Sequence, residues 1–512
     1  MYPRKYRLAD PLNVTQREKL FQSTSSKSRH DRTTAILTPR WWLVLPCLTL
    51  IILIQSSDPL LMNDFIIRHY ERRYGFDTSP GSQHKDCIKS QRTSSSSQSY
   101  WQFYSNDQNH PDYSKVQQDA ASFHTKNSIV GLIPASLTFI LFGANCDHIG
   151  RRPLIILPLI GKIIWYSSML IIVHRNLSDT WILSARALDS IFGSGGLIML
   201  GALAYVTDCT NTSNRPRAFL LTEAIMFLAR IIPVLAIGIW LRYFQYTVPL
   251  SVCLSLSVIA LIYAIFIQPE SIENARTMSF FKQLTLIRFK YLINIVTVYT
   301  KKRSDNKRQL LILITIISIL IQVAVFGYLS ILSLYLYGQP LCLDALHVGL
   351  LSTAQAVLVF LWSIITALIN KPFDNSYLPL FMGIFAIIGN LIILAFAKTI
   401  WLLYIGVCIG SLAFMIMPIL RAKIVKQIEM NEYAIVFIAA GIIETIGHSA
   451  VGAAANSIYN ATLKFLPGLV FLVFAGIAII TISIISYLAF LEQKISKNTN
   501  ANRQNQPSVT HL

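Results

Sequence analysis

Several ionisable side chains stand inside stretches of sequence that are otherwise apolar. A charge in the interior of a membrane is costly unless water or an opposite charge serves it, so such residues default to functional candidates. Carboxylates and imidazoles can exchange protons, and a guanidinium group can bind an anion. The candidates for proton transfer and solute binding are Glu223, Arg421, Asp58, Arg230, Glu444 and His448.

Glu223 is the strongest candidate for proton exchange. It lies a few residues into an apolar stretch that begins after Arg217. Arg230 follows two helical turns later on the same face, about 10 Å away by helix rise. That separation is too long for direct contact, but it is short enough for the cation to bias the carboxylate. The alternative is a structural role, in which Glu223 hydrogen-bonds to a neighbouring helix.

The other buried charges also have structural alternatives. Glu444 and His448 are four residues apart on one helix face and could satisfy each other. Arg421 ends its apolar stretch, as an ordinary basic residue at a cytoplasmic surface would. Lysine and arginine near the end of a membrane helix can extend to the interface. We therefore favour structural roles for three residues nearer the ends of their stretches, Lys162, Arg186 and Asp189.

A second cluster occupies the turn between two apolar runs, at residues 143–154. Asp147 and Arg151 are four residues apart, so they can pair locally or bind neighbouring helix ends. Glycine lets the backbone reverse and approach closely. The alternative is an ordinary basic turn, but the spacing G-x-x-x-D-x-x-G-R-R is more specific than that. Its candidate residues are Gly143, Asp147, Gly150, Arg151 and Arg152.

Composition places most of this chain in lipid. Of its 512 residues, 53% are hydrophobic and 13% are charged, and the mean hydropathy is +0.51. A soluble protein of this size carries about 25% charged residues. The net charge of +19 therefore indicates a cytoplasmic membrane face and a lipid bilayer as partner, and it does not indicate nucleic acid.

No sequence motif of a membrane hydrolase or an ATP-driven pump is present. The chain lacks H-E-x-x-H, G-x-S-x-G and a phosphate-binding lysine loop, and it has no cluster of Cys and His in its outside loops. We therefore expect no enzyme activity, no cofactor and no metal site. Carboxylates inside the membrane leave ion-coupled transport as the natural mechanism.

The apolar stretches predict twelve membrane-spanning helices and an all-α membrane protein. Each stretch has about 20 residues, enough to cross a bilayer. They lie near 41–63, 128–146, 154–173, 181–206, 219–240, 247–268, 310–336, 347–370, 378–397, 401–420, 434–457 and 467–490.

The distribution of Lys and Arg predicts the orientation and the domain layout. Short loops on one side carry more of these residues, which favours both termini in the cytoplasm. Six spans on either side of a basic linker predict two packed half-bundles with a substrate site between them. Residues 280–299 of the linker fit a helix that lies on the membrane surface. The predicted regions are a disordered tail 1–40, a first bundle 41–268 with a long outside loop 64–127, a linker 269–309, a second bundle 310–490 and a tail 491–512.

Two of the seven cysteines fall in predicted outside loops, Cys87 and Cys342. An isolated pair in an oxidising space predicts one disulfide that joins the two bundles, and the alternative is two free thiols. Two N-x-S/T sequons, at Asn176 and Asn460, also lie outside. Both are close to the membrane, so glycosylation at either is only a weak expectation.

Several motifs resemble those of known transporters. The 143–154 turn resembles the loop between the second and third helices of major facilitator transporters. Further stretches resemble the proton-coupled folate transporter family, which includes the thymic stromal cotransporter. These stretches are Gly131–Pro134, Arg151–Leu154, Phe219–Ala224, Leu334–Cys342, Met417–Lys423 and Asn456–Phe465.

This resemblance implies a twelve-helix proton symporter of the major facilitator fold. In the family, the positions of Cys87 and Cys342 form a disulfide, Glu223 is the coupling carboxylate and Arg421 is tied to substrate and proton binding. Asp147, Arg151 and Asp208 match gate residues, and Asp208 could pair with Arg151 in one access state only. The sequence departs from the folate transporter at Ser194, where that family has aspartate, and at Val325, where it has histidine. The departure at Val325 puts folate specificity and an acid pH optimum in doubt.

The leading prediction is therefore a proton-coupled symporter of an organic solute, either folate-like or another organic anion, working by alternating access. Its partners would be a small-molecule solute and protons, and the chain would be a monomer or a homo-oligomer. The alternatives are a facilitative uniporter of the same fold and a non-transporting receptor or scaffold. The absence of a convincing sorting signal in the tails slightly favours the plasma membrane over endolysosomal membranes.

Overall fold

The fold is described from a computed structural model of the chain. The described residues are 39–76, 87, 113–193, 195–210, 215–276, 278, 282–283, 285–288, 297–301, 303, 306–368, 377–428 and 433–504. The regular structure of these residues is helical. Twelve helices are long and apolar enough to cross a membrane, which confirms the predicted number of spans and the all-α class.

Among the described residues, the first six spans are built from eight helices and helical segments, and two of these spans are each formed by two pieces. A 3-10 turn leads into the first span, and the fourth is broken into α6 and α7. In chain order they are η2 (Trp41–Val44) with α2 (Leu45–Arg73), α4 (Tyr113–Ile149), α5 (Arg152–Arg175), α6 (Asp179–Ile191) with α7 (Gly195–Asp208), α8 (Arg215–Tyr243), α9 (Thr247–Phe266) and, after the sixth span, the short α10 (Glu273–Arg276).

The last six spans follow after the linker. The fourth of them is interrupted by a 3-10 segment. They are α13 (Lys307–Tyr337), α14 (Ala345–Leu368), α15 (Leu378–Phe396), α16 (Ile400–Gly410) with η4 (Ser411–Met415) and α17 (Ile416–Lys426), α18 (Tyr433–Thr462) and α19 (Leu469–Gln504).

Several predicted boundaries were wrong because helices continue past their apolar stretches. Helix α2 extends to Arg73 and α4 begins at Tyr113, so the loop predicted for 64–127 is much shorter. The extension of α2 carries Asp64, Arg68 and Glu71, which are buried and bound by protein groups. Arg68 lies 3.1 Å from Asp64, and the Tyr113 hydroxyl donates to Glu71 over 2.8 Å. Helix α19 likewise continues to Gln504, beyond the predicted start of the tail at 491.

The linker is described only in pieces. Most of the surface helix predicted for 280–299 falls outside the described residues. One described piece contacts the bundle directly, since the Arg288 amide donates to the Asn145 side-chain oxygen over 2.8 Å. The predicted tail 1–40 also lies outside the described residues, except for its last two positions.

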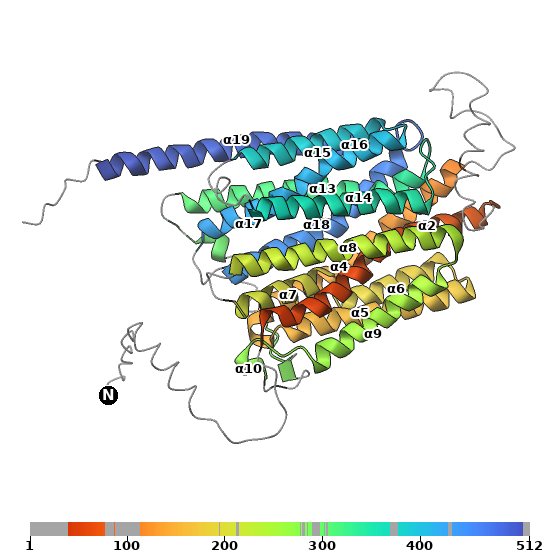
Figure 1. Cartoon of the computed structure of the whole chain (residues 1–512), viewed down its shortest axis with the longest axis horizontal. Helices are drawn as coiled ribbons and strands as arrows, with labels where there is room; N and C mark the ends of the chain where they lie inside the picture. The colour runs from red at the N-terminus through yellow and green to blue at the C-terminus, as the bar shows by residue number, and fades with distance from the viewer. Residues whose placement is uncertain are drawn as a thin grey trace, which may run out of the picture. The chain divides into compact units, whose positions relative to one another are not determined.

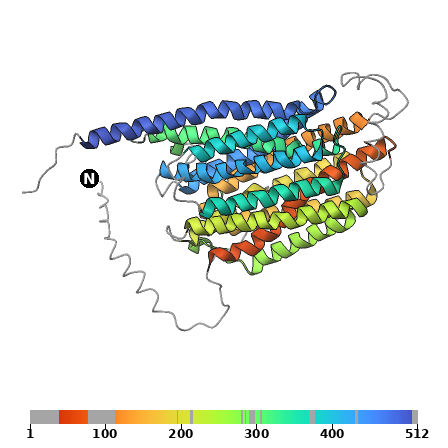
Figure 2. The same ribbon diagram turned by 45° about the horizontal axis from the view of Figure 1, so that its top comes forward.

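The two sets of six spans lie side by side. Figures 1 and 2 show α4 and α8 at the border of the first set, facing α18 and α14 of the second. Gly238 of α8 and Gly349 of α14 allow their backbones to approach closely, because a Cβ on either would lie 3.0 Å from the other's Cα. Small residues at such crossings are typical of packed membrane helices.

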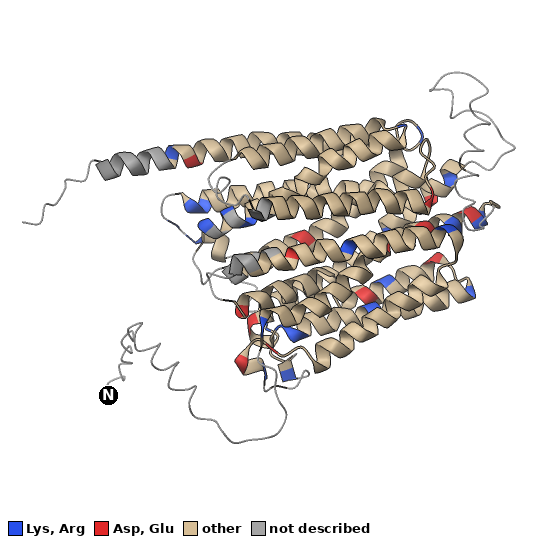
Figure 3. Ribbon diagram, viewed as in Figure 1, with Lys and Arg blue, Asp and Glu red and all other residues tan. Residues whose placement is uncertain are grey.

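Charged residues gather at the two ends of the bundle (Figure 3). One end carries the connection between α4 and α5, and we call it the turn end. The opposite end carries a disulfide between Cys87 and Cys342, which confirms the predicted bridge, and we call it the disulfide end. Large apolar side chains such as Ile232, Phe385 and Ile480 are exposed along the sides of the bundle, as expected for a surface that faces lipid.

Polar contacts accompany the disulfide in joining the two sets of spans. The Tyr459 hydroxyl of α18 donates to the Gln117 side chain of α4 over 3.0 Å. Arg242 of α8 lies 3.8 Å from Asp344, just before α14. The disulfide end is therefore closed by a covalent bond, a buried hydrogen bond and an ion pair.

The disulfide can be tested by substitution and cleavage. We expect Cys87→Ser and Cys342→Ser each to remove the same bridge, so that the double variant behaves like either single variant. Loss of the bridge should lower the free energy of unfolding by about 2–4 kcal/mol. After proteolytic cleavage within 269–309, native fragments should stay together on a non-reducing gel. Separation of the native fragments without reductant would rule out the bridge.

Candidate functional site

Arg151 is the centre of the turn-end cluster. Its guanidinium lies 2.7 Å from the Asp147 carboxylate and 2.9 Å from the Asp208 carboxylate, so it ties the end of α4 to the end of α7. Burial lowers the pKa of Arg151, but the neighbouring Cys146 thiol, the hydrogen bond and charge of Asp208 and the charge of Asp147 together hold that pKa above the ordinary arginine value. Arg151 is therefore a permanent cation that holds two carboxylates.

Sequence reasoning missed Glu270, which lies directly after α9. Its carboxylate is buried and accepts hydrogen bonds from the amides of Arg151 (2.8 Å) and Arg152 (3.0 Å) at the start of α5. An acid at a helix N-terminus satisfies amides that have no partner within the helix and complements the helix dipole. The signal that could have found it is a lone acid placed just after the sixth apolar stretch.

Gly150 makes room for this carboxylate. Its φ is +94°, which disfavours any residue with a side chain, and a Cβ there would lie 2.5 Å from the Glu270 Oε2 atom. Arg152 completes the junction, because its guanidinium donates to the carbonyls of Ala264 and Ile265 at the end of α9. Gly143 lies in α4, where its Cα faces Ile438 of α18 and Leu200 of α7.

Glu223 and Arg421 form an ion pair between the two sets of spans. The Arg421 guanidinium on α17 donates to the Glu223 carboxylate on α8 over 3.0 Å. Sequence analysis had named both residues without pairing them. Their side chains are 21% and 37% exposed, so water reaches both. The structure therefore gives Glu223 a cation from α17, and Arg230 is not its partner.

Arg230 instead lies in the middle of the bundle, near two residues of the second set of spans. Its charge acts on the Tyr328 hydroxyl of α13 and on His448 of α18. The His448 ring packs on Phe326 of α13, with ring centroids 5.1 Å apart. No carboxylate lies within ion-pair distance of Arg230 in the described part of the chain, and its side chain is exposed. The region thus holds an uncompensated cation.

Asp58 lies in a separate network within the first six spans. The Tyr166 hydroxyl donates to its Oδ1 atom, and the Lys162 amine lies 3.5 Å from its Oδ2 atom. Lys162 also lies 3.2 Å from Asp189, and Arg186 lies 2.9 Å from the same Asp189 oxygen. Lys162, Arg186 and Asp189, which were expected to have structural roles, are therefore linked to the functional candidate Asp58.

The remaining predicted positions are placed as follows. Glu444 and His448 both lie on α18, but no hydrogen bond or ion pair between them is found, so the prediction that they satisfy each other is not supported. Asn176 ends α5 in a left-handed conformation, and its side-chain oxygen accepts a hydrogen bond from Arg72. Asn460 lies within α18, not in a loop. Val325 is buried in α13, and Ser194 lies outside the described residues.

The close contact between Gly150 and the Glu270 carboxylate gives a prediction about stability. Gly150→Ala should displace the Glu270 carboxylate and impose a strained φ, which should lower the free energy of unfolding by about 1–3 kcal/mol. Thermal unfolding of the purified chain measures this change. Gly476→Ala is the matched control, because a Cβ there meets no atom within 4 Å. Equal thermal midpoints for the two variants would contradict the packing described here.

Comparison with known proteins gives the family. The profile of the Major Facilitator Superfamily matches residues 114–452. The chain is 24% identical over 378 residues to the lysosomal proton-coupled steroid conjugate and bile acid symporter of Gallus gallus, an alignment that covers 73% of this chain and 80% of that protein. It is 27% identical over 349 residues to the proton-coupled folate transporter of Rattus norvegicus, covering 68% and 74%.

Solved structures share the fold. The human organic anion transporter MFSD10 (TETRAN) superposes with a TM-score of 0.57 at 14% identity, over 88% of this chain and 100% of that one. A peptide transporter POT superposes with a TM-score of 0.59 at 11% identity, over 89% and 98%. These relatives are transporters and not enzymes, in agreement with the sequence analysis. With a family profile that spans two thirds of its length, the chain belongs to the Major Facilitator Superfamily of membrane transporters.

Proposed function

We propose that this protein is a proton-coupled symporter that carries an organic anion by alternating access. The curated relatives named above are proton-coupled transporters of folate and a symporter of steroid conjugates and bile acids. Folates and bile acids carry carboxylates at neutral pH. An anionic solute also suits the cations found between the two sets of spans.

The ion pair between Glu223 and Arg421 carries this proposal. It joins α8 to α17 across the two sets of spans, and both side chains are reached by water. A proton on Glu223 would neutralise the carboxylate and release Arg421, which weakens this tie and frees a cation. Protonation would therefore be linked both to the separation of the two sets and to the binding of an anion.

The substrate region is proposed to lie around Arg230 and His448. An arginine at mid-depth is costly without a counter-charge, and an anionic substrate would supply one. His448 and Tyr328 of the second set of spans lie near Arg230, and Phe326 packs on the His448 ring. Apolar walls with a few placed polar groups are typical of small-molecule sites. Glu444 lies one turn from His448 on α18 and remains a candidate for the same pathway.

The turn-end cluster is proposed as the gate. Arg151 would hold Asp147 and Asp208 in one access state and release them in the other, with Gly143 and Gly150 permitting close helix packing. In the proposed orientation the turn end and both termini are cytoplasmic, and the disulfide end faces outward or into a lumen. Two six-helix bundles, 41–268 and 310–490, would then rock about the substrate site, with the plasma membrane favoured as the location.

Glu223→Gln tests the coupling. Because Gln resembles a protonated Glu, we expect the variant to lose proton-driven accumulation while it retains exchange of solute across the membrane. Proteoliposomes with an imposed pH gradient measure accumulation, and counterflow without a gradient measures exchange. Estrone sulfate, taurocholate and folate serve as radiolabelled solutes.

Glu492→Gln is the matched control for this test. Glu492 pairs with Lys423 over 3.5 Å, near the same end, but both residues belong to the last six spans. That variant should accumulate solute as the native chain does. Accumulation that survives in Glu223→Gln would remove Glu223 from the coupling mechanism, and native uptake that ignores the pH gradient would indicate a uniporter.

The gate gives a further prediction. Arg151→Ala should lower turnover about fivefold or more, because it releases two carboxylates at once and shifts the balance of access states. Asp147→Ala should have a smaller effect, because the Asp147 side chain is 47% exposed and Asp208 still holds Arg151. Initial rates at saturating solute measure turnover. A lower solute affinity with unchanged turnover in Arg151→Ala would contradict the gate role.

A further inference from the structure

Five side chains on three helices form a closed charge network inside the first six spans. They are Asp58 on α2, Lys162 and Tyr166 on α5, and Arg186 and Asp189 on α6. Two carboxylates and two cations make the network neutral when both acids are ionised. A proton bound by either acid therefore leaves a net positive charge, and the two cations must share the other carboxylate.

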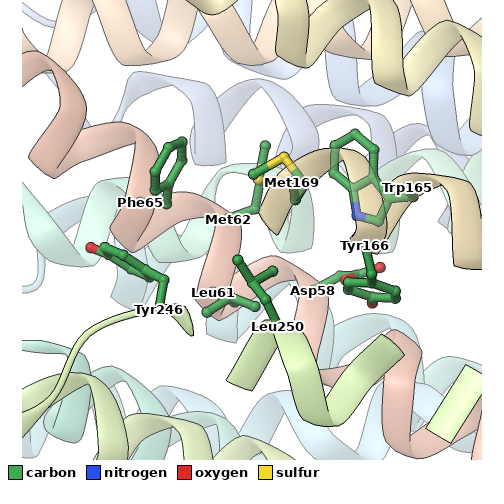
Figure 4. A pocket seen from close by; sticks show the side chains of 9 residues that line it. All are labelled: Asp58, Leu61, Met62, Phe65, Trp165, Tyr166, Met169, Tyr246 and Leu250. Atoms are coloured by element: carbon green, nitrogen blue, oxygen red, sulfur yellow. The ribbon is translucent and has the colours of Figure 1, made fainter. Parts of the chain in front are cut away.

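Asp58 is the acid that water can reach. Its side chain is 27% exposed, whereas the Asp189 side chain is 2% exposed. Asp58 also lines a small cavity between α2, α5 and α9, shown in Figure 4. Asp58, Trp165 and Tyr166 stand at one side of this cavity, and Phe65 and Tyr246 stand at the other, toward the disulfide end. The cavity volume of about 10 Å³ is near the least that one water molecule requires.

Asp189 is shared by two cations. Its Oδ2 atom lies 3.2 Å from the Lys162 amine and 2.9 Å from the Arg186 guanidinium. Lys162 in turn interacts with two acids, Asp189 and Asp58, and the Asp58 carboxylate lies 3.5 Å from its amine. If Asp58 is neutral, Lys162 loses one of its two anions and moves toward Asp189. The interaction between Asp189 and Arg186 then becomes weaker, because Lys162 competes for the same carboxylate.

Arg186 connects this network to the space between the two sets of spans. Its charge acts on His448 of α18, as does the charge of Arg230. The Arg186 Nε atom is buried and has no hydrogen-bond partner among the described residues. It faces Gly131 of α4, where a Cβ would lie 3.0 Å from that atom. The guanidinium thus has a donor that no described protein group uses, on the side that faces α4.

We propose that Asp58 is a second protonation site, and that its protonation releases Arg186 from Asp189 to bind the substrate anion. The proton would come from water in the cavity beside Tyr166 and would bind the Asp58 carboxylate. Lys162 would then carry the change in charge to Asp189. The groups facing Asp58 are Lys162 and Tyr166 of α5, Arg186 and Asp189 of α6, and the Cys253 thiol of α9. This inference rests on the proposed function, and it adds a relay that is separate from the Glu223–Arg421 pair.

The test measures anion affinity in the purified full-length chain at pH 5.5 and pH 7.5. Estrone sulfate and taurocholate are suitable probes, because both stay ionised over this range and any pH dependence must come from the protein. The native chain should bind about fivefold more tightly, or more, at the lower pH. Asp58→Asn should lose most of this pH dependence and bind at both pH values close to the native affinity at pH 5.5, with only the contribution of Glu223 left.

A second variant separates the relay from simple damage to the fold. Lys162→Gln removes the cation that carries the signal and leaves Asp189 to Arg186 alone, so its affinity should be weak at both pH values. The two variants should therefore lose the pH dependence in opposite directions. Asp179→Asn is the matched control. Asp179 accepts a hydrogen bond from Tyr70 as Asp58 does from Tyr166, but its other partner is His69, so this variant should keep the native pH dependence.

The outcomes separate this inference from the proposed function. A native pH dependence that persists in Asp58→Asn would overturn the relay and leave the proposed symport intact. A pH dependence lost in Asp58→Asn with affinity fixed at the weak value would also overturn it, since Arg186 would then not be released. A native chain that binds neither probe at either pH would overturn the anion assignment and the relay with it.

Discussion

The cost of an isolated charge in a membrane governs the interior of this protein. Lipid offers no hydrogen bonds, so a buried charge needs water or a partner within the protein. Most of the charges inside the described bundle meet this requirement through pairs that join different helices. Asp58, Lys162, Arg186 and Asp189 connect α2, α5 and α6, and Glu223 with Arg421 connects α8 to α17. Arg230 departs from this rule, and for that reason we proposed it as a site for an anionic solute.

The same requirement shapes the ends of the helices. The start of α5 would present unpaired amides and the end of α9 unpaired carbonyls. Glu270 accepts from the former, and Arg152 donates to the latter. This junction therefore fixes two spans, α5 and α9, to each other through their termini. Arg151 adds α4 through Asp147 and α7 through Asp208, so four of the first six spans are tied together at the turn end.

The two ends of the bundle are joined by interactions of different strength. The disulfide end combines a covalent bond with buried polar contacts between the two sets of spans, such as Gln117 with Tyr459. At the turn end, the pair of Glu223 and Arg421 is partly exposed to water. A contact between ionisable groups that water reaches can be broken by one proton, whereas a disulfide or a neutral hydrogen bond cannot. The Glu223–Arg421 pair, unlike the Arg242–Asp344 pair at the disulfide end, has no covalent bond beside it, so we propose it as the crossing contact that responds to a proton gradient.

The sequence by itself determined the number of spans and the class of fold, because about twenty apolar residues in a row have few alternatives to a membrane helix. It also determined the Cys87–Cys342 bridge, since the other cysteines fell within or at the cytoplasmic ends of the predicted spans. The sequence did not give the helix ends. The apolar stretches end before Asp64 and begin only near residue 128, but α2 and α4 continue through residues such as Glu71 and Gln117, whose polar groups are bound by other parts of the protein.

Only the tertiary structure decided which charges meet. Glu223 and Arg230 share a helix, and their spacing suggested that they influence each other, yet the partner of Glu223 comes from α17, 198 residues away. The sequence analysis did not single out Glu270, because an acid just after an apolar stretch does not reveal which helix start it binds, here the amides of α5. Such pairings depend on which helices, far apart in the chain, pack side by side. The spacing of residues along one helix does not determine this packing.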